Sequence, residues 1–379
     1  MAVRHPLALD AAAPGEAALF LAPAGLADRV GELPLPCRLL RVPAGVEIPP
    51  SPPPGVTRLD GPGGVVLAAP ARALREAVPG GLAELLDRLD GPIPATRFAD
   101  GETWAFPGRT RIMGILNVTP DSFSDGGLWN DPARAIARAA EMLEEGAEIL
   151  DVGGESTRPG AAPVDPDEEL RRVVPVIRAI RREFPGARVS VDTRRARVAA
   201  AALDAGADLV NDVSALADPE MAGVVAEAGC PVVLMHMRGT PDRMQDDTTY
   251  DDLLGEIAAH LAERRDRALA AGVADDRILL DPGIGFGKSF AGNEEILRLL
   301  QGLRVLGAPL VVGVSRKRFL GARTGVSVPA DRVPASLAAG IAAAWRGAAV
   351  LRVHDVAATR QALAIADALA PRAEGGTRP

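Results

Sequence analysis

The stretch RIMGILNVTPDSFSDGG, residues 111–127, shows the pattern that organises most of the chain. Its first part is a short apolar run, typical of a strand that is buried on both faces of a sheet. The run ends in Asn117 and opens into a long loop with an acid, hydroxyl groups and a phenyl ring. A core strand more often ends in a plain turn, so these side chains indicate a loop that serves a binding or catalytic site.

Similar apolar runs, each followed by a segment of helical periodicity, recur eight times from Arg109 onward, over about 260 residues. Buried strands that alternate with helices favour a parallel sheet covered on its outer face. Eight such units favour an α/β fold of the (β/α)₈ or TIM barrel type, over residues 108–370, rather than an open doubly wound sheet. The predicted strands are 112–117, 147–152, 188–192, 208–212, 231–237, 278–282, 309–315 and 349–355.

The segment 164–184, VDPDEELRRVVPVIRAIRREF, illustrates the helices between these strands. Asp165 is placed to cap the first turn, and Pro166 has the backbone angle that a first turn requires. Apolar residues then recur at three- and four-residue steps and predict one buried face: Leu170, Val173, Ile177, Ile180 and Phe184.

Seven of the eight predicted strands end in polar side chains, at the carboxyl ends where (β/α)₈ barrels hold their active sites. So many amides, acids and bases exceed what turns require, and we expect them to surround one mouth. They are Asn117, Asp151, Asp192, Asn211, Asp281, Ser315 with Arg316 and Lys317, and Arg352 with His354, while Met237 ends the remaining strand.

The last two strand ends carry cations, in SRK at 315–317 and RVH at 352–354. Arg352 and His354 lie two residues apart, so both project into the mouth, where barrels of this type often bind phosphate. We therefore expect a phosphate or diphosphate site. The alternative is that Arg352 pairs with a nearby acid such as Asp355 and that His354 is a packed core residue.

Two carboxylates and an amide, from Asp192, Asp281 and Asn211, suit a flat heterocycle with adjacent N–H groups. The alternative for Asp192 is helix capping. Asn117 offers a hard carbonyl oxygen that could hold Mg²⁺ together with a diphosphate. The alternative for Asn117 is a side-chain hydrogen bond that stabilises the turn.

The chain has 2 lysines against 40 arginines, which indicates that Lys288 and Lys317 occupy places where a guanidinium cannot replace an ammonium. Lys288 lies in DPGIGFGKS, residues 281–289, which imitates half of a P-loop but has Pro282 where the first glycine is needed. We expect a flexible glycine turn that lets Phe286 lean over the mouth, with Lys288 structural and paired with an acid.

The histidines outside the strand ends are predicted to play no direct part. His236, in LMHM at 234–237, is expected to be a buried residue in or behind the site wall. His5 and His260 are expected on the surface.

Residues 1–107 hold 17 of the 33 prolines and only short apolar runs, with one helical pattern at 80–91. We expect a small, loosely organised N-terminal extension of unknown role, with a linker ending near Pro107, and a disordered tail over 371–379.

The composition excludes several classes of protein. A net charge of −8 without a basic cluster disfavours a nucleic-acid partner. Two cysteines form no disulfide framework or zinc site and suit a reducing cytoplasm. The N-terminus lacks the order of a signal peptide, and no segment approaches the roughly 18 apolar residues of a membrane span.

Taken together, the motifs resemble those of the dihydropteroate synthases, in the same order over 109–370. They are NVTPDSFSDGG (117–127), DVGGESTRPGA (151–161), SVDT (190–193), ND (211–212), LMHMRGTPDRMQ (234–245), DPGIGFGK (281–288), GVSRK (313–317) and RVHDV (352–356). The resemblance implies a homodimeric barrel that joins 6-hydroxymethyl-7,8-dihydropterin diphosphate to p-aminobenzoate, releases diphosphate in folate synthesis and is a target of sulfonamides.

The resemblance also implies roles for single residues. It implies that Asn117 binds Mg²⁺. It also implies that the loops 118–128 and 153–164 close over the mouth when diphosphate is present. The residues implied to bind the diphosphate are Arg158, Arg352 and His354. Those implied to bind the pterin are Asp192, Asn211, Met235, Asp281 and Lys317. Those implied to bind p-aminobenzoate are Thr157, Pro159, Phe286, Ser315 and Arg316.

Two other functions are weighed against this one. A pterin-binding barrel that passes a methyl group from a folate to a corrinoid protein would need the acids and the amide, but not the cations. A Schiff-base lyase could use Lys317, but would leave Asn117 and the loop after Asp151 without a task.

Overall fold

The computed structural model describes residues 5–44, 46, 48, 50–106, 109–119, 132–156, 160 and 163–369. Its centre is a closed barrel of eight parallel strands in the order β10-β11-β12-β13-β14-β7-β8-β9, which confirms the predicted fold class. The strands are β7 (Arg111–Asn117), β8 (Ile149–Gly153), β9 (Arg188–Asp192), β10 (Leu209–Asp212), β11 (Val232–Met235), β12 (Ile278–Asp281), β13 (Leu310–Val312) and β14 (Ala348–Val353).

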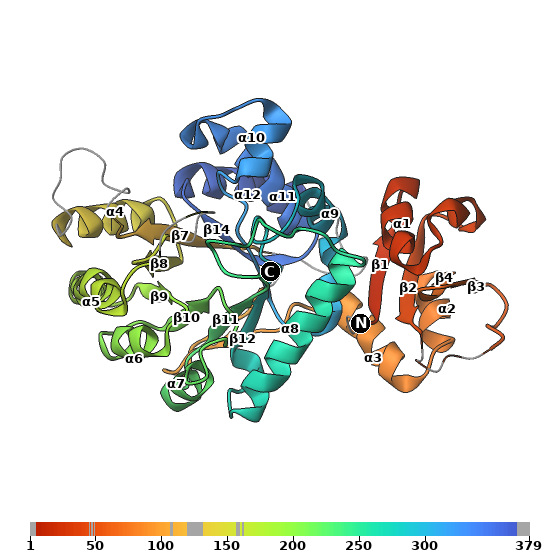
Figure 1. Cartoon of the computed structure of the whole chain (residues 1–379), viewed down its shortest axis with the longest axis horizontal. Helices are drawn as coiled ribbons and strands as arrows, with labels where there is room; N and C mark the ends of the chain where they lie inside the picture. The colour runs from red at the N-terminus through yellow and green to blue at the C-terminus, as the bar shows by residue number, and fades with distance from the viewer. Residues whose placement is uncertain are drawn as a thin grey trace.

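Helices surround the barrel, as Figure 1 shows. Their apolar faces pack on the outer side chains of the strands in one continuous hydrophobic core. The helices are α4 (Pro132–Glu144), α5 (Pro166–Glu183), α6 (Ala196–Asp204), α7 (Met221–Ala228), α8 (Leu253–Ala270), α9 (Phe290–Leu299), α10 (Arg318–Thr324), α11 (Val333–Trp345) and α12 (Val356–Leu369). Short 3₁₀ turns join them at η4 (Asp275–Arg277), η5 (Leu300–Leu306) and η6 (Pro329–Arg332).

Most predicted elements are confirmed, and the differences lie at strand ends. The strand predicted at 188–192 is β9, and the Asp165 carboxylate accepts a 2.9 Å hydrogen bond from the Asp167 amide at the start of α5. β13 ends at Val312, three residues before its predicted end, so SRK at 315–317 lies in a loop. Side chains in a loop need not follow the strict alternation between two faces that a strand imposes.

The N-terminal segment is folded, so the expectation of a loose extension is wrong. An antiparallel sheet in the order β1-β2-β4-β3 packs with three helices around a core that includes Phe20, Leu40 and Leu86. Frequent prolines and strand pairings between segments distant in sequence conceal such a sheet from periodicity analysis. The elements are β1 (Leu7–Ala11), α1 (Pro14–Leu21), η1 (Ala22–Ala24), η2 (Ala27–Glu32), β2 (Cys37–Pro43), β3 (Thr57–Gly61), β4 (Gly64–Ala69), α2 (Ala71–Glu76) and α3 (Gly80–Asp90).

A buried ion pair joins this N-terminal domain to the barrel. Arg41 on β2 donates to both carboxylate oxygens of Asp252, at 2.7 and 2.9 Å, and both side chains are almost fully buried. Asp252 also caps α8 by accepting from the Gly255 amide. The domain lies beside η5 and α9, at the right of Figure 1.

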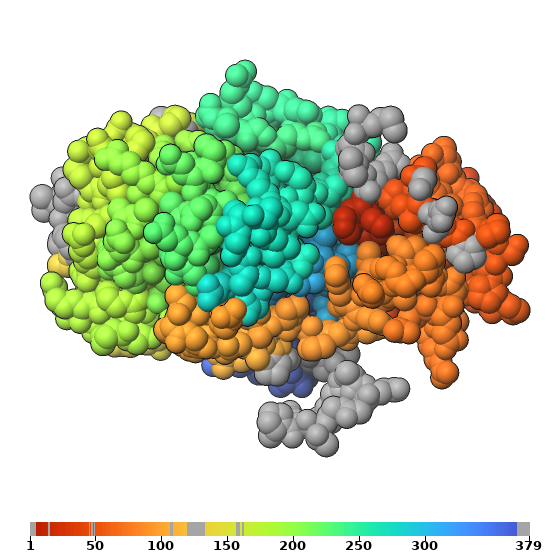
Figure 2. All heavy atoms as spheres, turned by 90° about the horizontal axis from the view of Figure 1, so that it is seen from below, coloured from red at the N-terminus to blue at the C-terminus, as the bar shows by residue number. Residues whose placement is uncertain are grey.

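The segment between the N-terminal domain and β7 closes the end of the barrel at which the strands begin. The hairpin of β5 (Thr96–Arg97) and β6 (Thr103–Trp104) carries Phe98 and Trp104, which with Phe106 pack against the first inward-facing residues of the strands. Figure 2 shows the orange segment continuing from the N-terminal domain across the underside of the barrel. The segment predicted to be a linker therefore fills this end of the barrel. Pro107 and the tail over 371–379 lie outside the described residues.

Both cysteines, Cys37 and Cys230, are buried and free. No described helix combines the length and the hydropathy needed to cross a membrane.

Candidate active site

A cavity of about 530 Å³ opens at the carboxyl ends of the strands. Each of the eight strands, or the loop that follows it, supplies lining residues, so the predicted mouth exists. Its lining includes these predicted site residues: Asn117, Asp192, Asn211, Met235, Asp281, Phe286, Ser315, Arg316, Lys317, Arg352 and His354. Thr157, Arg158 and Pro159, with most of the loop 118–128 and part of 153–164, lie outside the described residues.

Arg352 lies between two carboxylates on one side of the cavity. Its Nε donates to Asp151 Oδ2 and its Nη2 to Asp192 Oδ2, each at 2.6 Å. Asn211 Nδ2 donates to the same Asp151 oxygen at 3.1 Å. The strands β8, β9, β10 and β14 thus hold one hydrogen-bonded network. Arg352 does pair with nearby acids, as the alternative interpretation has it, but its partners are Asp151 and Asp192 rather than Asp355.

The network changes how Asp192 titrates. Burial raises the pKa of Asp192 to about 7, the Arg352 guanidinium opposes this rise, and the Asp151 carboxylate adds to it. Asp192 is therefore poised between its neutral and ionised forms near physiological pH, where a bound N–H group decides which form prevails.

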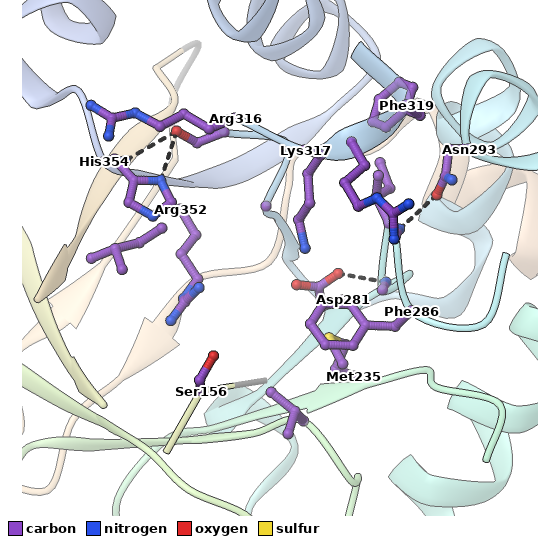
Figure 3. A pocket seen from close by; sticks show the side chains of 18 of the residues that line it. Ser156, Met235, Asp281, Phe286, Asn293, Arg316, Lys317, Phe319, Arg352 and His354 are labelled. Carbon is purple, nitrogen blue, oxygen red and sulfur yellow. Dashed lines mark hydrogen bonds between the residues drawn. The ribbon is translucent and has the colours of Figure 1, made fainter. Parts of the chain in front are cut away.

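The opposite side of the cavity combines Asp281, Lys317 and Phe286. Asp281 Oδ1 accepts a 2.6 Å hydrogen bond from the Gly283 amide, and Lys317 Nζ lies 4.2 Å from the centre of the Phe286 ring. Figure 3 shows the Lys317 side chain extending toward Asp281. Burial lowers the pKa of Lys317 to about 8, as does Arg352, while Asp281 opposes the change. Burial also raises the pKa of Asp281.

The loop after β13 divides its side chains between different tasks. Ser315 Oγ lies 3.0 Å from His354 Nδ1 and accepts from the His354 amide at 3.1 Å. Arg316 has a positive φ of 59°, which is unfavourable for a residue with a side chain. Its Nε donates to Asp355 Oδ2 at 3.0 Å, so the expected cationic rim is partly neutralised there.

The comparisons with known proteins agree with this geometry. A family model described as "Pterin binding enzyme" matches residues 113–354. The dihydropteroate synthase of Synechocystis sp. is 46% identical over 291 residues, which cover 76% of this chain and 98% of that protein. The enzyme of Escherichia coli (strain K12) is 45% identical over 257 residues, covering 68% of this chain and 90% of that protein. The chain belongs to the dihydropteroate synthase family.

Solved structures of other dihydropteroate synthases share its fold. The Xanthomonas albilineans enzyme with 4-aminobenzoic acid has a TM-score of 0.68 at 47% identity, covering 73% of this chain and 98% of that one. The complex of that enzyme with 7,8-dihydropteroate has a TM-score of 0.66 at 44% identity, and the match again covers 73% of this chain and 98% of that one. The Yersinia pestis enzyme with a sulfonamide drug complex has a TM-score of 0.67 at 46% identity, and the match covers 71% of this chain and 96% of that one.

Some residues that line the cavity were not predicted from the sequence. Gln245 Nε2 donates to the Gly285 carbonyl, and Asn293 Oδ1 accepts from the Gly285 amide, so both hold the wall that carries Phe286. Arg318, which directly follows Lys317, is exposed, lines the cavity and forms no ion pair with any residue that the structure describes. Its position beside SRK was the only signal in the sequence.

The residues at the rim fit a magnesium ion of the kind that the family implies. Asn117 Oδ1 and Asp192 Oδ2 each lie 3.5 Å from the position that a Cβ on Gly153 would take, so the two oxygens are neighbours, and Asp192 Oδ2 accepts from Arg352. No cluster of three or more acidic, histidine or cysteine ligands occurs among the described residues. Mg²⁺ keeps most of its waters and needs only one or two protein oxygens beside substrate phosphates, which suits this arrangement.

The remaining predictions concern Lys288 and the histidines. Lys288 is 1% exposed, and its hydrogen-bond partners are His236 and two carbonyl oxygens rather than the expected acid. His236 is buried, as predicted. His5 and His260 are half-buried, so their placement on the surface is wrong, and the His260 ring lies 4.9 Å from that of His236.

Proposed function

We propose that this chain is a transferase that joins 6-hydroxymethyl-7,8-dihydropterin diphosphate to p-aminobenzoate, giving 7,8-dihydropteroate and diphosphate in folate biosynthesis. The observation that carries the proposal is one cavity in which acids and an amide stand beside cations from β14 and the loop after β13. The relatives described above bear the same activity in their names.

The pterin is assigned to the deep side of the cavity. Asp192, Asp281 and Asn211 can accept from and donate to the edge of a flat heterocycle, and Lys317 adds a cation beside them. Met235, buried at the end of β11, offers an apolar surface for the ring.

The chemistry is a substitution at the methylene carbon of the pterin. The C–O bond breaks, and its electron pair leaves with the diphosphate. The neutral arylamine supplies the electron pair of the new C–N bond and releases its proton to the departing diphosphate, so no strong general base is required. Arg352 and His354, together with Arg158, bind the leaving anion, and the nearby carboxylates stabilise positive charge on the pterin.

We assign Asn117 to a Mg²⁺ ion that accompanies the diphosphate. The bound ion would offset the negative charge that develops on the leaving group. Asn117 would supply one oxygen ligand, and its place at the end of β7 keeps that oxygen at the rim.

p-Aminobenzoate is assigned to the outer side, against Phe286 and the loop residues Thr157 and Pro159. Its carboxylate needs a cation, and three of the guanidinium groups that line the cavity are engaged. Arg316 pairs with Asp355, Arg332 binds carbonyl oxygens, and Arg352 already serves the diphosphate in this proposal. We therefore assign the carboxylate to Arg318 rather than to Ser315 and Arg316. Sulfonamides would compete for the same place.

A homodimer in the cytoplasm completes the proposal. Trp345, Ile365 and Leu369 are large apolar residues, between 53% and 69% exposed, on the adjacent helices α11 and α12, and a second copy would cover them. Buried, unpaired cysteines are consistent with a reducing compartment. Light scattering of the purified chain tests the dimer.

The test of the function is product analysis. Isotopically labelled p-aminobenzoate and dihydropterin diphosphate should yield labelled 7,8-dihydropteroate, identified by mass spectrometry. Methyl transfer from a methylated folate to a corrinoid, without labelled product, would favour the alternative barrel enzyme. A borohydride-trapped adduct on Lys317 would favour a Schiff-base lyase.

A further inference from the structure

Lys288 is a fully buried amine whose contacts the reaction does not explain. Its Nζ lies 2.8 Å from His236 Nδ1, 2.9 Å from the His236 carbonyl oxygen and 2.9 Å from the Phe286 carbonyl oxygen. It also lines the active-site cavity. These contacts join the residue that follows β11 to the loop between β12 and α9.

The loop that Lys288 binds depends on glycine for its backbone conformation. Gly283, Gly285 and Gly287 have positive φ values of 67°, 86° and 66°, which only glycine adopts without strain. Phe286 stands between two of them, and its ring faces Lys317 at 4.2 Å. Figure 3 shows Phe286 beside Met235 and Asp281. The proposed function places the pterin and the p-aminobenzoate on either side of this ring.

The site accepts a lysine better than an arginine. An amine makes its hydrogen bonds tetrahedrally from one atom, which matches two carbonyl oxygens and His236 Nδ1 around one point, whereas a guanidinium is planar and larger. A Cβ at Gly283 would come within 3.1 Å of Nζ, so little space is left. Burial lowers the pKa of Lys288 well below its ordinary value, which Asp281 only partly opposes. A chain with 2 lysines and 40 arginines has kept one of its lysines here.

We propose that Lys288 is a positioning residue for the acceptor substrate: by joining His236 to the Phe286 carbonyl, it fixes the Phe286 ring between the p-aminobenzoate and Lys317. The proposal rests on the proposed function for the identity of the acceptor. Lys288 acts through Phe286 and does not touch the reacting atoms.

The first test compares Lys288→Met with the wild type. Methionine keeps the length and the apolar stem but removes every hydrogen bond from Nζ. We expect the KM for p-aminobenzoate to rise about tenfold, because Phe286 in the cavity wall loses its fixed position. The KM for dihydropterin diphosphate should rise less than about threefold. Lys288→Arg should give no rescue. The control is Arg304→Met, which removes a cation from the Gly91 carbonyl far from the cavity.

A second comparison asks whether Lys288 acts through Phe286. In a Phe286→Ala background, the change Lys288→Met should add less than a further twofold to the KM for p-aminobenzoate. Multiplied effects in the double variant, equal rises in both KM values, or a pattern identical to Arg304→Met would each overturn the proposal.

A third measurement does not depend on the reaction. Hydrogen exchange should accelerate at the amides of 283–287 in Lys288→Met, but not at those of β12 or in Arg304→Met. Unchanged exchange at 283–287 would overturn the positioning role. A wild type that is inactive, with faster exchange in Lys288→Met, would contradict the proposed function and leave the contacts of Lys288 supported.

Discussion

Arg352 and Asp192 form a 2.6 Å ion pair across the barrel, from β14 to β9, and a second carboxylate, Asp151, holds the same guanidinium. Arg352, which is expected to bind the diphosphate, and Asp192, which is expected to bind the pterin, are therefore paired with each other in this structure. Such pairing fixes the geometry of both groups before any substrate arrives, which favours catalysis by positioning and electrostatics.

The first prediction concerns pH. Because burial raises the pKa of Asp192 to about 7, the side chain is mostly protonated at pH 6 and mostly ionised at pH 8. If the ionised form accepts from the pterin N–H groups, pterin affinity should rise about tenfold between these values. Calorimetry with a free pterin at both values checks this. Asp192→Asn should bind more weakly and lose most of the difference, whereas equal wild-type affinities would contradict the role of Asp192.

The second prediction concerns Lys317. Lys317→Ala should remain folded, because the lysine ends in a cavity, but should lose about 10- to 100-fold in pterin affinity, the usual effect of one charge-assisted hydrogen bond. Calorimetry measures the loss, and circular dichroism confirms the fold. Lys317→Arg serves as a matched control of equal charge, which we expect to bind poorly because Phe286 and Asp281 confine the ammonium. An unchanged affinity in Lys317→Ala would exclude Lys317 from the pterin site.

The third prediction separates Arg318 from Arg316. Arg318→Gln should raise the KM for p-aminobenzoate about tenfold through loss of a charged hydrogen bond, and leave that for dihydropterin diphosphate unchanged. With p-aminobenzamide, which has no carboxylate, wild type and variant should behave alike. A similar loss with the amide would show that Arg318 does not bind the carboxylate. A rise in the KM for the diphosphate substrate would instead place Arg318 at the anion site.

The fourth prediction concerns the N-terminal domain. Arg41→Ala leaves the buried Asp252 without its partner and should reduce the free energy of unfolding by about 3 to 5 kcal/mol. Denaturant titration of the whole chain measures this. Arg75→Ala, which breaks an exposed pair with Asp87, is the control and should change the midpoint little. Equal effects of the two substitutions would show that the Arg41–Asp252 contact is dispensable.

Local patterns predicted the barrel well, because each strand and helix carries its own signal. Asp165 caps α5 and β9 spans 188–192 as expected, since capping and buried strands depend on neighbours in sequence. The cavity lining followed from one rule about strand ends. The sequence did not reveal that Arg352 pairs with Asp151 and Asp192, which lie 201 and 160 residues away.

The loop after β13 differs from the prediction for a local reason. Arg316 and Lys317 adjoin in sequence, but a positive φ at Arg316 sends one side chain to Asp355 and leaves the other in the cavity. No spacing rule anticipates such a turn at a residue other than glycine. The N-terminal sheet was missed because prolines are frequent in this part of the chain and two of its three strand pairings join segments that are distant in sequence.

The most direct measurement is diphosphate release by the purified chain given 6-hydroxymethyl-7,8-dihydropterin diphosphate, with and without p-aminobenzoate. Release that depends on p-aminobenzoate, with one dihydropteroate formed per diphosphate, is the expected result. Release at the same rate without p-aminobenzoate, or none with both substrates and Mg²⁺ present, would mean that the acids and cations around this cavity serve another reaction.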